Sequence, residues 1–413
     1  MPIERVETLV IGGGQAGLTM SHRLRQHGLS HLVLERGRIA ERWRSERWDG
    51  LRFQFPNWSV RLPDFAFPHT DADGFATADQ IVDFIAAYAA FVAPPIRCNV
   101  EVTRLRRSGD AFGFVAETPH GAIEARNVVA ATGPYQRPIR PHLFDDAGIF
   151  EVHASRYANP DQLPGGAVLV VGGGASGAQI AEELRRAGRK VFLSIGRHTR
   201  MPRRYRGRDL VWWLSEMRID QRPAEQRGPT RLLPVISGAY GGRTVDFRRF
   251  AADGVVLLGR VMAARDGVLD IATDLTESLA DGDLRYTSFL DVVDAYVQQR
   301  GLDCPPDPDA RAVLPDPPCV TEPLRRLDLG AEGIHSVIWA TGYGVDFGWI
   351  DIDVFTAEGE PRHAGGISDV PGLYFLGLQW LSKMSSSFLS GVGDDAAVLA
   401  QHIAARSKKD PAM

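Results

Sequence analysis

The stretch that decides the fold is VLVVGGGASGAQIAEELRRAG, residues 168–188. It joins a run of β-branched apolar residues, a glycine-rich turn and a helical pattern with apolar residues at Ile180 and Leu184. A glycine turn placed between a strand and a helix is typical of dinucleotide binding, because it lets the backbone approach a pyrophosphate. This stretch has the form of the beginning of a nucleotide-binding domain, yet it lies in the middle of the chain.

The same pattern occurs at the N-terminus as TLVIGGGQAGLTMSHRLRQHG, residues 8–28, and the two copies align without a gap. In each copy the first glycine makes the tight turn, the second allows close approach of a pyrophosphate, and the third lets the helix pack on the strand. The sequence therefore predicts an α/β protein with two Rossmann-like dinucleotide-binding domains. The candidate binding residues of the two turns are Gly12, Gly14, Gln15, Ala16 and Gly17 in the first, and Gly172, Gly174, Ser176 and Gly177 in the second.

The two copies differ after their second strand. The first has Glu35, followed by Arg36, and a carboxylate there accepts hydrogen bonds from ribose hydroxyls, as in FAD or NAD sites. The second has Ile195, followed by arginines at positions 197, 200, 203, 204, 206 and 208, the arginine run. A guanidinium holds a 2′-phosphate that a carboxylate would repel, so we expect NADP(H) here, bound first by Arg197 and next by Arg200. A solvated or nucleic-acid-binding face is the alternative for the later arginines.

Two Ala-Thr-Gly segments indicate how the domains connect. They are VVAATGPYQRP, residues 128–138 with Gly133, and VIWATGYGVDF, residues 337–347. Each places an apolar strand before a flexible glycine and an irregular segment, as expected for a crossing between domains. We expect an FAD-binding domain of residues 1–161 plus 339–413, with an NADP(H)-binding domain of residues 162–338 inserted into it.

The composition excludes several classes of protein. The net charge is −4 and the hydrophobic and charged fractions are 44% and 24%, so nothing global indicates nucleic acid as a partner. No apolar run approaches the roughly 20 residues of a membrane span. The three cysteines form no CxxC pair and the histidines show no metal-ligand spacing, so we expect no metal site. A cytoplasmic location is the default expectation.

The chain resembles class B flavin-dependent monooxygenases, the group that includes flavin-containing and Baeyer–Villiger monooxygenases. Within that group it is most similar to bacterial flavoprotein oxidoreductases associated with cation efflux or potassium transport. The resemblance covers nearly the whole chain. It rests on VIGGGQAGL, VLERGRIAERWRSERWDGLRFQFPNW, ATGPY, VVGGGASGAQIAEEL, GRHTRMPRRYRGRD, WATGY and PGLYFLGLQWLSKMSSSFLSGVGDDAA.

The resemblance implies further roles around a flavin. Glu35 and Arg36 would hold the ADP part of FAD, and Trp43 would pack near the flavin, although a core position is its alternative. Asn57 is the candidate catalytic residue, which would hydrogen-bond the flavin–oxygen adduct; an asparagine that merely forms a turn is the alternative. Near the C-terminus, Gly377 and Gln379 would approach the ribityl chain. Asp394 and Asp395 would lie at a helix N-cap aimed at the flavin's O2–N1 edge, or act only as caps.

The resemblance also implies a reaction. NADPH would reduce FAD, and the reduced flavin would react with O2 to give a C4a-(hydro)peroxyflavin that oxygenates a small organic substrate, at nitrogen or sulfur. The segment GIFEVHASRYANP, with His153 and Tyr157, matches the family's linker fingerprint only in part and favours heteroatom oxygenation over ketones. The alternatives are Baeyer–Villiger oxidation of a ketone, an NADPH oxidase or reductase, and a redox-sensing flavoprotein that oxygenates nothing.

Overall fold

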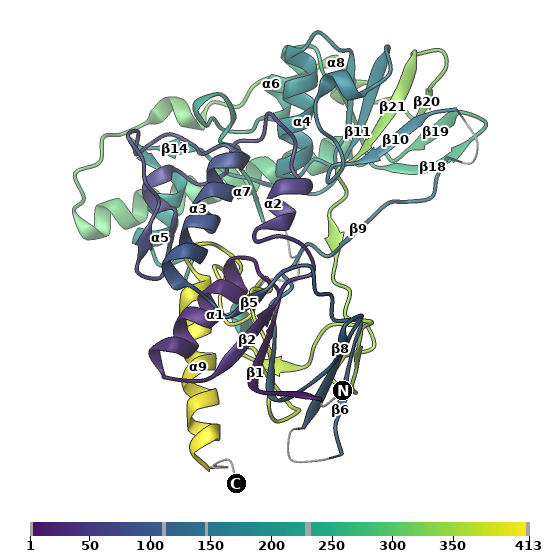
Figure 1. The fold of residues 1–413 in the computed structure, drawn as a ribbon. Helices are drawn as coiled ribbons and strands as arrows, with labels where there is room; N and C mark the ends of the chain where they lie inside the picture. Colours follow the sequence, from purple (N-terminus) through teal and green to yellow (C-terminus); the bar gives the residue numbers. More distant parts are fainter. Residues whose placement is uncertain (1–2, 110–112, 145–147, 228–232, 410–413) are drawn as a thin grey trace.

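The computed structural model describes residues 3–109, 113–144, 148–227 and 233–409. It confirms a mixed α/β fold built around two separate sheets, each formed about one of the glycine-turn strands. We call the part around the first sheet the first unit and the part around the second sheet the second unit. Figure 1 shows both chain ends in the first unit and the second unit above it.

The first unit contains a ten-stranded mixed sheet with the path β23-β6-β7-β8-β1-β2-β5, extended by β24–β26 beside β8. The strand of the first glycine turn, β1, is central and pairs in parallel with both β2 and β8. Helix α1 packs between this sheet and α9. The elements of this unit are β1 (Glu4–Ile11), α1 (Gln15–Gln26), β2 (His31–Leu34), α2 (Glu41–Ser45), η1 (Asn57–Ser59), β3 (Arg61–Leu62), β4 (Phe65–Ala66), α3 (Ala78–Val92), β5 (Ile96–Arg97), β6 (Arg104–Arg107), β7 (Phe114–Thr118), β8 (Gly121–Ala130), β23 (Ile350–Asp351), β24 (His363–Ala364), β25 (Ile367–Ser368), β26 (Leu373–Phe375) and α9 (Val392–Lys409).

The second unit contains a five-stranded parallel sheet in the order β10-β21-β11-β12-β17. Its central strand β11 is wholly buried, which explains the continuous apolar run of the sequence. The elements are β10 (Phe150–His153), η2 (Pro160–Gln162), β11 (Ala167–Val171), α4 (Ala175–Arg186), β12 (Val191–Ser194), β13 (Thr199–Arg200), β14 (Arg204–Tyr205), β15 (Arg208–Asp209), α5 (Leu210–Glu216), η3 (Ala224–Gln226), β16 (Pro234–Val235), η4 (Ala239–Gly241), α6 (Phe247–Ala252), β17 (Val256–Leu258), β18 (Val261–Arg265), β19 (Val268–Ile271), α7 (Leu275–Arg300), η5 (Pro308–Arg311), α8 (Pro318–Thr321), β20 (Arg326–Asp328) and β21 (Ile334–Trp339).

The two Ala-Thr-Gly segments lead out of corresponding strands, β8 and β21, and then run side by side. β9 (Arg137–Pro138) pairs antiparallel with β22 (Tyr343–Gly344) between the two units. β10 lies before the boundary expected at residue 162, yet it pairs with β21 in the second sheet. We therefore propose that the second unit begins near residue 150 and ends near residue 340, where the chain returns to the first unit.

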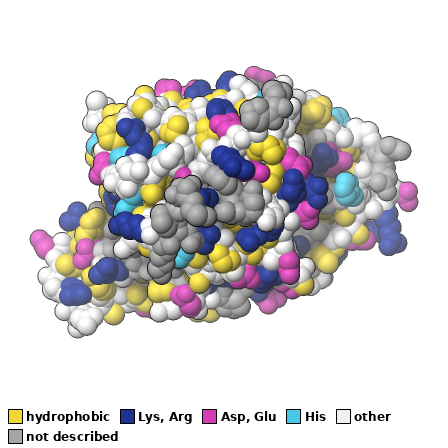
Figure 2. Space-filling model, turned by 60° about the horizontal axis from the view of Figure 1, so that its bottom comes forward, with side chains coloured by type: hydrophobic (Ala, Val, Ile, Leu, Met, Phe, Trp, Pro, Cys, Tyr) yellow, Lys and Arg dark blue, Asp and Glu magenta, His cyan; other side chains and the backbone are white. Residues whose placement is uncertain are grey.

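The surface carries charges of both signs. Figure 2 shows basic and acidic side chains interspersed over the face in view, without a large field of one sign. Within the described ranges no helix is both long and apolar enough to cross a membrane.

Candidate active site

One large cavity of about 1090 Å³ lies between the two units. Single ligand pockets are commonly about 300–1,000 Å³, so this cavity can hold more than one extended ligand. Both glycine turns open on it, through Gly12 and Gly14 of the first unit and Gly173 and Gly174 of the second. The structure thus brings together two binding motifs that lie 160 residues apart in the sequence.

The first glycine of each turn has the same conformation and the same reason to be glycine. Gly12 has φ +118° and Gly172 has φ +119°, a backbone region that favours glycine. A Cβ on Gly12 would lie 2.5 Å from the carbonyl oxygen of Ala131, and one on Gly172 would lie 2.4 Å from that of Ala340. Each turn is therefore closed against the Ala-Thr-Gly segment of its own unit.

The third glycine of each turn serves the packing of the helix. A Cβ on Gly17 would lie 1.8 Å from the carbonyl oxygen of Gly12, and one on Gly177 would lie 1.8 Å from that of Gly172. These distances are far inside van der Waals contact, so only glycine lets the helix start this close to the turn. Gly17, Gly172 and Gly177 do not line the cavity; they shape the turns that do.

Both helices that follow the turns leave their N-termini open. α1 and α4 begin after Gly14 and Gly174 without a side-chain cap and without an acidic residue in the first turn. By contrast, α3 is capped by Thr77 and Gln80, and α5 by Asp209. A Cβ on Gly14 or Gly174 would meet nothing within 4 Å, so space remains above each helix start. Free N–H groups, a favourable dipole and open space are what a pyrophosphate requires, and both sites fit a dinucleotide.

The carboxylate that distinguishes the first site is held in place by the backbone. Glu35 directly follows β2, and its carboxylate accepts hydrogen bonds from the N–H of Gly13 at 2.5 Å and of Gly37 at 2.8 Å. In the second unit, Ile195 occupies the equivalent place beside Gly173 and is fully buried. The first site therefore has a fixed carboxylate at the end of its second strand, whereas the second has an apolar side chain there.

The arginine run divides into one cavity residue, three arginines held in ion pairs, and two exposed arginines, Arg204 and Arg208. Arg197 lines the cavity and makes no ion pair with any described residue. Arg200, the second expected phosphate ligand, is 6% exposed and is bound by Asp246 and Asp283. Arg203 and Arg206 are paired with Asp209 and Asp294. We therefore correct the expectation for Arg200: its charge is neutralised inside the second unit and it does not line the cavity.

Three further expected residues lie outside the cavity lining. The Asn57 side-chain amide donates to the carbonyl oxygen of Asp71 at 2.9 Å, so it is engaged in the turn of its own loop. Helix α9 begins at Val392, so Asp394 and Asp395 lie within its first turn and are not N-cap residues. Asp394 is paired with Lys383, and Asp395 is buried, which raises the pKa of its carboxyl group. None of the three faces the cavity, and the assignment of Asn57 as the catalytic donor is not supported by its geometry.

The other expected contacts do line the cavity. They are Gln15, Ala16, Glu35, Arg36, Trp43, Gly133, Ser176, Gly377 and Gln379. Gly377 has φ +78° and a Cβ there would lie 2.8 Å from the Cβ of Ala16, so the end of β26 passes close to the first glycine turn. The amide of Gln15 donates to the carbonyl oxygen of Ser387 at 3.1 Å, which ties the C-terminal segment to the same turn.

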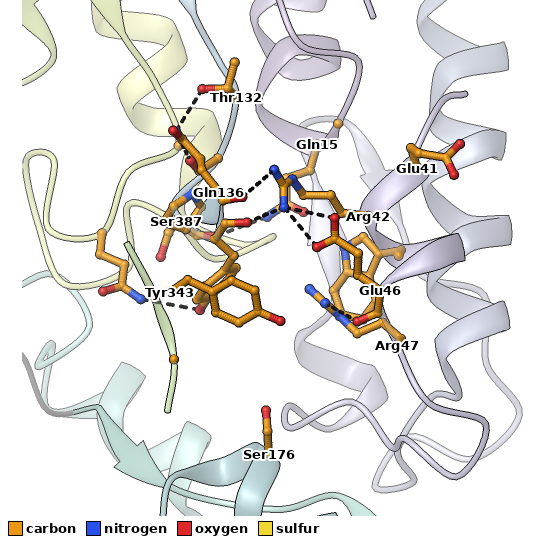
Figure 3. A pocket seen from close by; sticks show the side chains of 18 of the residues that line it. Gln15, Glu41, Arg42, Glu46, Arg47, Thr132, Gln136, Ser176, Tyr343 and Ser387 are labelled. Atoms are coloured by element: carbon orange, nitrogen blue, oxygen red, sulfur yellow. Dashed lines mark hydrogen bonds and ion pairs between the residues drawn. The ribbon is translucent and has the colours of Figure 1, made fainter. Parts of the chain in front are cut away.

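A polar network at the domain crossing was not anticipated from the sequence. Arg42 on α2 donates to the carboxylate of Glu46 and to the carbonyl oxygens of Tyr135 and Gln136 (Figure 3). The Gln136 amide nitrogen donates to Gly133 at 2.7 Å, and its oxygen accepts from the N–H of Asp346 at 2.6 Å. The two crossings are therefore hydrogen-bonded through one glutamine. Its partners lie up to 210 residues away, so no local spacing could have shown this.

The linker residues His153 and Tyr157 have structural partners. The His153 ring contacts the carbonyl oxygen of Gly342 and packs edge-on against Tyr343, and burial lowers the pKa of His153. The Tyr157 hydroxyl donates to Glu183 at 2.8 Å, and burial raises the pKa of both groups. In the described part of the chain, no group of three or more His, Cys, Asp or Glu side chains is placed to hold a metal ion.

Comparison with known proteins identifies the family. A model of the pyridine nucleotide-disulphide oxidoreductases matches residues 9–221, which contain both glycine turns. The chain belongs to this family. A CzcO-like oxidoreductase of Geobacillus kaustophilus is 33% identical over 96% of this chain and 98% of its own length. An indole-3-pyruvate monooxygenase of rice, YUCCA8, is 26% identical over 96% of this chain and 90% of its own.

Among solved structures, a flavin-containing monooxygenase of Stenotrophomonas maltophilia superimposes with a TM-score of 0.67 at 19% identity, covering 98% of this chain and 99% of its own. The chain is thus an oxidoreductase by its family and has the fold of a flavin-containing monooxygenase. Its three cysteines are free, so the disulphide chemistry in the family's name has no cysteine pair here.

Proposed function

We propose that this family member is an NADPH-dependent, FAD-containing monooxygenase that oxygenates a small organic substrate, at nitrogen or sulfur. The observation that carries the proposal is that two dinucleotide sites of different character open on one cavity. A hydride donor and a flavin bound at these sites would share that enclosure, as transfer between them requires.

We assign one cofactor to each site from the residues present. In the first unit, the open start of α1, the carboxylate of Glu35 and Arg36 would hold the ADP part of FAD. In the second, the open start of α4 would hold the pyrophosphate of NADP(H), with Arg197 at its 2′-phosphate. Bound FAD supplies hydride acceptance and, when reduced, the activation of dioxygen.

The chain's own contribution near the reacting centre is an aromatic wall. Trp43, Phe53, Phe55 and Phe388 all line the cavity and follow one another with ring centroids 5.6, 5.4 and 5.0 Å apart. Such a wall excludes water and favours a substrate with apolar surface. Water exclusion matters for oxygenation because, without it, the electrons of a reduced flavin pass to dioxygen and are released as hydrogen peroxide.

An NADPH oxidase or reductase is the second candidate, and it would use the same two sites. A reductase that acts through a cysteine pair at this cavity is disfavoured, because none of the described lining residues is a cysteine. Baeyer–Villiger oxidation of a ketone differs from heteroatom oxygenation only in the substrate, and the same experiment separates them. The cytoplasmic location expected from the sequence stays a proposal that cell fractionation tests.

The experiment is anaerobic reduction of the FAD-loaded protein by NADPH, followed by stopped-flow mixing with oxygenated buffer. We expect a transient near-ultraviolet absorbance between the reduced and oxidised flavin spectra, and its decay should accelerate with oxidisable amines or sulfides. NADPH consumption should then be matched by oxygenated product. One-step reoxidation with one peroxide per NADPH, unaltered by amines, sulfides or ketones, would instead establish an oxidase. Failure of NADPH to reduce the flavin would reject both.

A further inference from the structure

The segment of residues 51–55, which we call the cavity loop, belongs to the first unit but is held by the second. All five of its residues line the cavity. Its Arg52 backbone exchanges two long hydrogen bonds of 3.4 Å with the Gln179 side chain on α4. At Gly238 of the second unit a Cβ would lie only 2.0 Å from the carbonyl oxygen of Phe53, so the two backbones are in direct contact. The loop is therefore clamped between the units.

The strongest contact of the clamp comes from Arg203. Its Nη1 donates to the carbonyl oxygen of Gln54 at 2.7 Å, while its Nε and Nη2 are bound by the carboxylate of Asp209 at 2.9 and 2.6 Å. Its guanidinium also lies 4.8 Å from the ring centre of Phe75. The Arg203 side chain is 2% exposed, so both the charge and the bond to Gln54 are shielded from water. Hydrogen bonds with an ionised donor or acceptor are stronger than those between neutral groups.

The geometry of the guanidinium explains why an arginine is required. Two donors are used by Asp209 and a third, in the same rigid plane, points at Gln54. Asp209 is itself fixed because it caps α5 by accepting from the N–H of Val211 at 2.8 Å. Helix α5 of the second unit therefore fixes, through Asp209 and Arg203, the backbone of Gln54, which lies between two residues of the aromatic wall.

We propose that Arg203 is a positioning residue that holds the cavity loop so that Phe53, Gln54 and Phe55 face the reacting centre. The side-chain amide of Gln54 has no hydrogen-bond partner among the described residues, so it is free to donate to a substrate or to an oxygen atom at the flavin. The inference rests on the proposed monooxygenase function for its chemical consequence, but the clamp itself does not depend on that function. Arg203 touches the loop backbone and acts through it.

The test compares Arg203→Lys with Arg200→Lys in the FAD-loaded protein. Arg200 is a matched control, because it is also buried, bound by two carboxylates and packed 4.4 Å from the centre of a tyrosine ring, yet makes no hydrogen bond to any of the described residues 51–55. We expect hydrogen–deuterium exchange across residues 51–60 to rise about tenfold in the Arg203 variant and to stay unchanged in the Arg200 variant. Equal exchange in the two variants would overturn the clamp.

The second readout is the fraction of NADPH that ends as peroxide in the presence of an oxidisable substrate. In Arg203→Lys this fraction should rise several-fold, with the KM for NADPH within about twofold of wild type, because the loop loosens while the NADP(H) site stays intact. Gly238→Ala, which presses on the loop from the other side, should give the same result if Arg203→Lys does not fold. A looser loop with unchanged coupling would overturn the positioning role. Peroxide alone from the wild type would reject the proposed function, while the exchange measurement would still decide the clamp.

Discussion

The two dinucleotide sites of this chain share one backbone plan but carry opposite chemistry. Their first glycines agree within one degree in φ, and their third glycines have the same 1.8 Å approach to the turn. After the second strand, however, one site has the carboxylate of Glu35 and the other has Ile195 followed by Arg197. The two turns thus have the same backbone geometry, and we propose that one or two side chains at the strand end select which dinucleotide each site binds.

The largest expected effect comes from replacing the third glycine of the turn in one unit at a time. Gly17→Ala places a Cβ 1.8 Å from a backbone oxygen and should yield protein that has lost FAD. Gly177→Ala, with the same clash in the second unit, should keep FAD but be reduced by NADPH at least about 100-fold more slowly at a fixed concentration. Flavin absorbance per protein and anaerobic reduction rates measure the two effects.

The control for this pair is Gly165→Ala, where a Cβ meets nothing within 4 Å and the backbone is not left-handed. It should leave both readouts unchanged. Equal loss of FAD in Gly17→Ala and Gly177→Ala would show that the units do not bind their cofactors separately.

Arg197→Ala tests whether the cation that follows the second strand of the second site binds the 2′-phosphate of NADPH. Removal of the unpaired cation should raise the KM for NADPH about 10- to 100-fold, the worth of one or two charge-assisted hydrogen bonds to phosphate, with little change for NADH. Arg208→Ala is the matched control, because Arg208 belongs to the same run but is exposed and stacks 5.0 Å from the ring centre of Trp212. An effect of Arg197→Ala no larger than that of Arg208→Ala would contradict the assignment of the 2′-phosphate to Arg197.

A smaller effect is expected when the carboxylate of the first site is introduced at the equivalent position of the second. Ile195→Glu would place a carboxylate beside Gly173, as Glu35 lies beside Gly13. The ratio of kcat/KM for NADH over that for NADPH should rise about tenfold, because the carboxylate accepts from ribose and repels the 2′-phosphate. Ile195→Gln keeps the shape without the charge and should change the ratio less. An unaltered ratio in Ile195→Glu would mean that this position does not face the ribose.

The smallest expected effect is the dependence of stability on pH, to which buried histidines of both units contribute. Burial lowers the pKa of His31 and His363 in the first unit and of His153 and His198 in the second. The unfolded chain then binds more protons near pH 6, so stability is complete above the ordinary histidine pKa of about 6.5 and declines as the pH falls. The Tm should drop between about pH 7.5 and about pH 5.5, because the free energy of unfolding falls by at most about 1.4 kcal/mol per pH unit for each histidine.

His198→Gln tests the source of this slope. The His198 ring is buried against Phe247, with centroids 4.8 Å apart, so the variant removes one titrating group from the core of the second unit. Its loss of Tm on acidification should be smaller than that of the wild type, although its Tm near neutral pH is lower. A steeper decline in the variant would show that His198 binds its proton more readily in the folded protein.

The sequence predicted the features that depend on neighbours in the chain. Both glycine turns, the strand–turn–helix order around them and the α/β class follow from local conformational demands, and all are confirmed. The misplaced residues depend on distant partners. Arg200 is withdrawn from the cavity by Asp246 and Asp283, which lie 46 and 83 residues away. Asn57 and Gln54 are three positions apart in one aperiodic loop, but Asn57 is held by Asp71 of that loop whereas Gln54, which lines the cavity, is held by Arg203 of the second unit.

The pairing of β9 with β22 has a consequence for the history of such chains. Because the outgoing and the returning strand lie side by side, with Pro138 opposite Tyr343 and Arg137 opposite Gly344, the chain leaves the first unit and re-enters it at nearly one point. The whole second unit can therefore be inserted or removed between two neighbouring chain positions without a change in the strand order of the first sheet. One insertion at this point would suffice to add a second nucleotide-binding unit to a protein that has only the first.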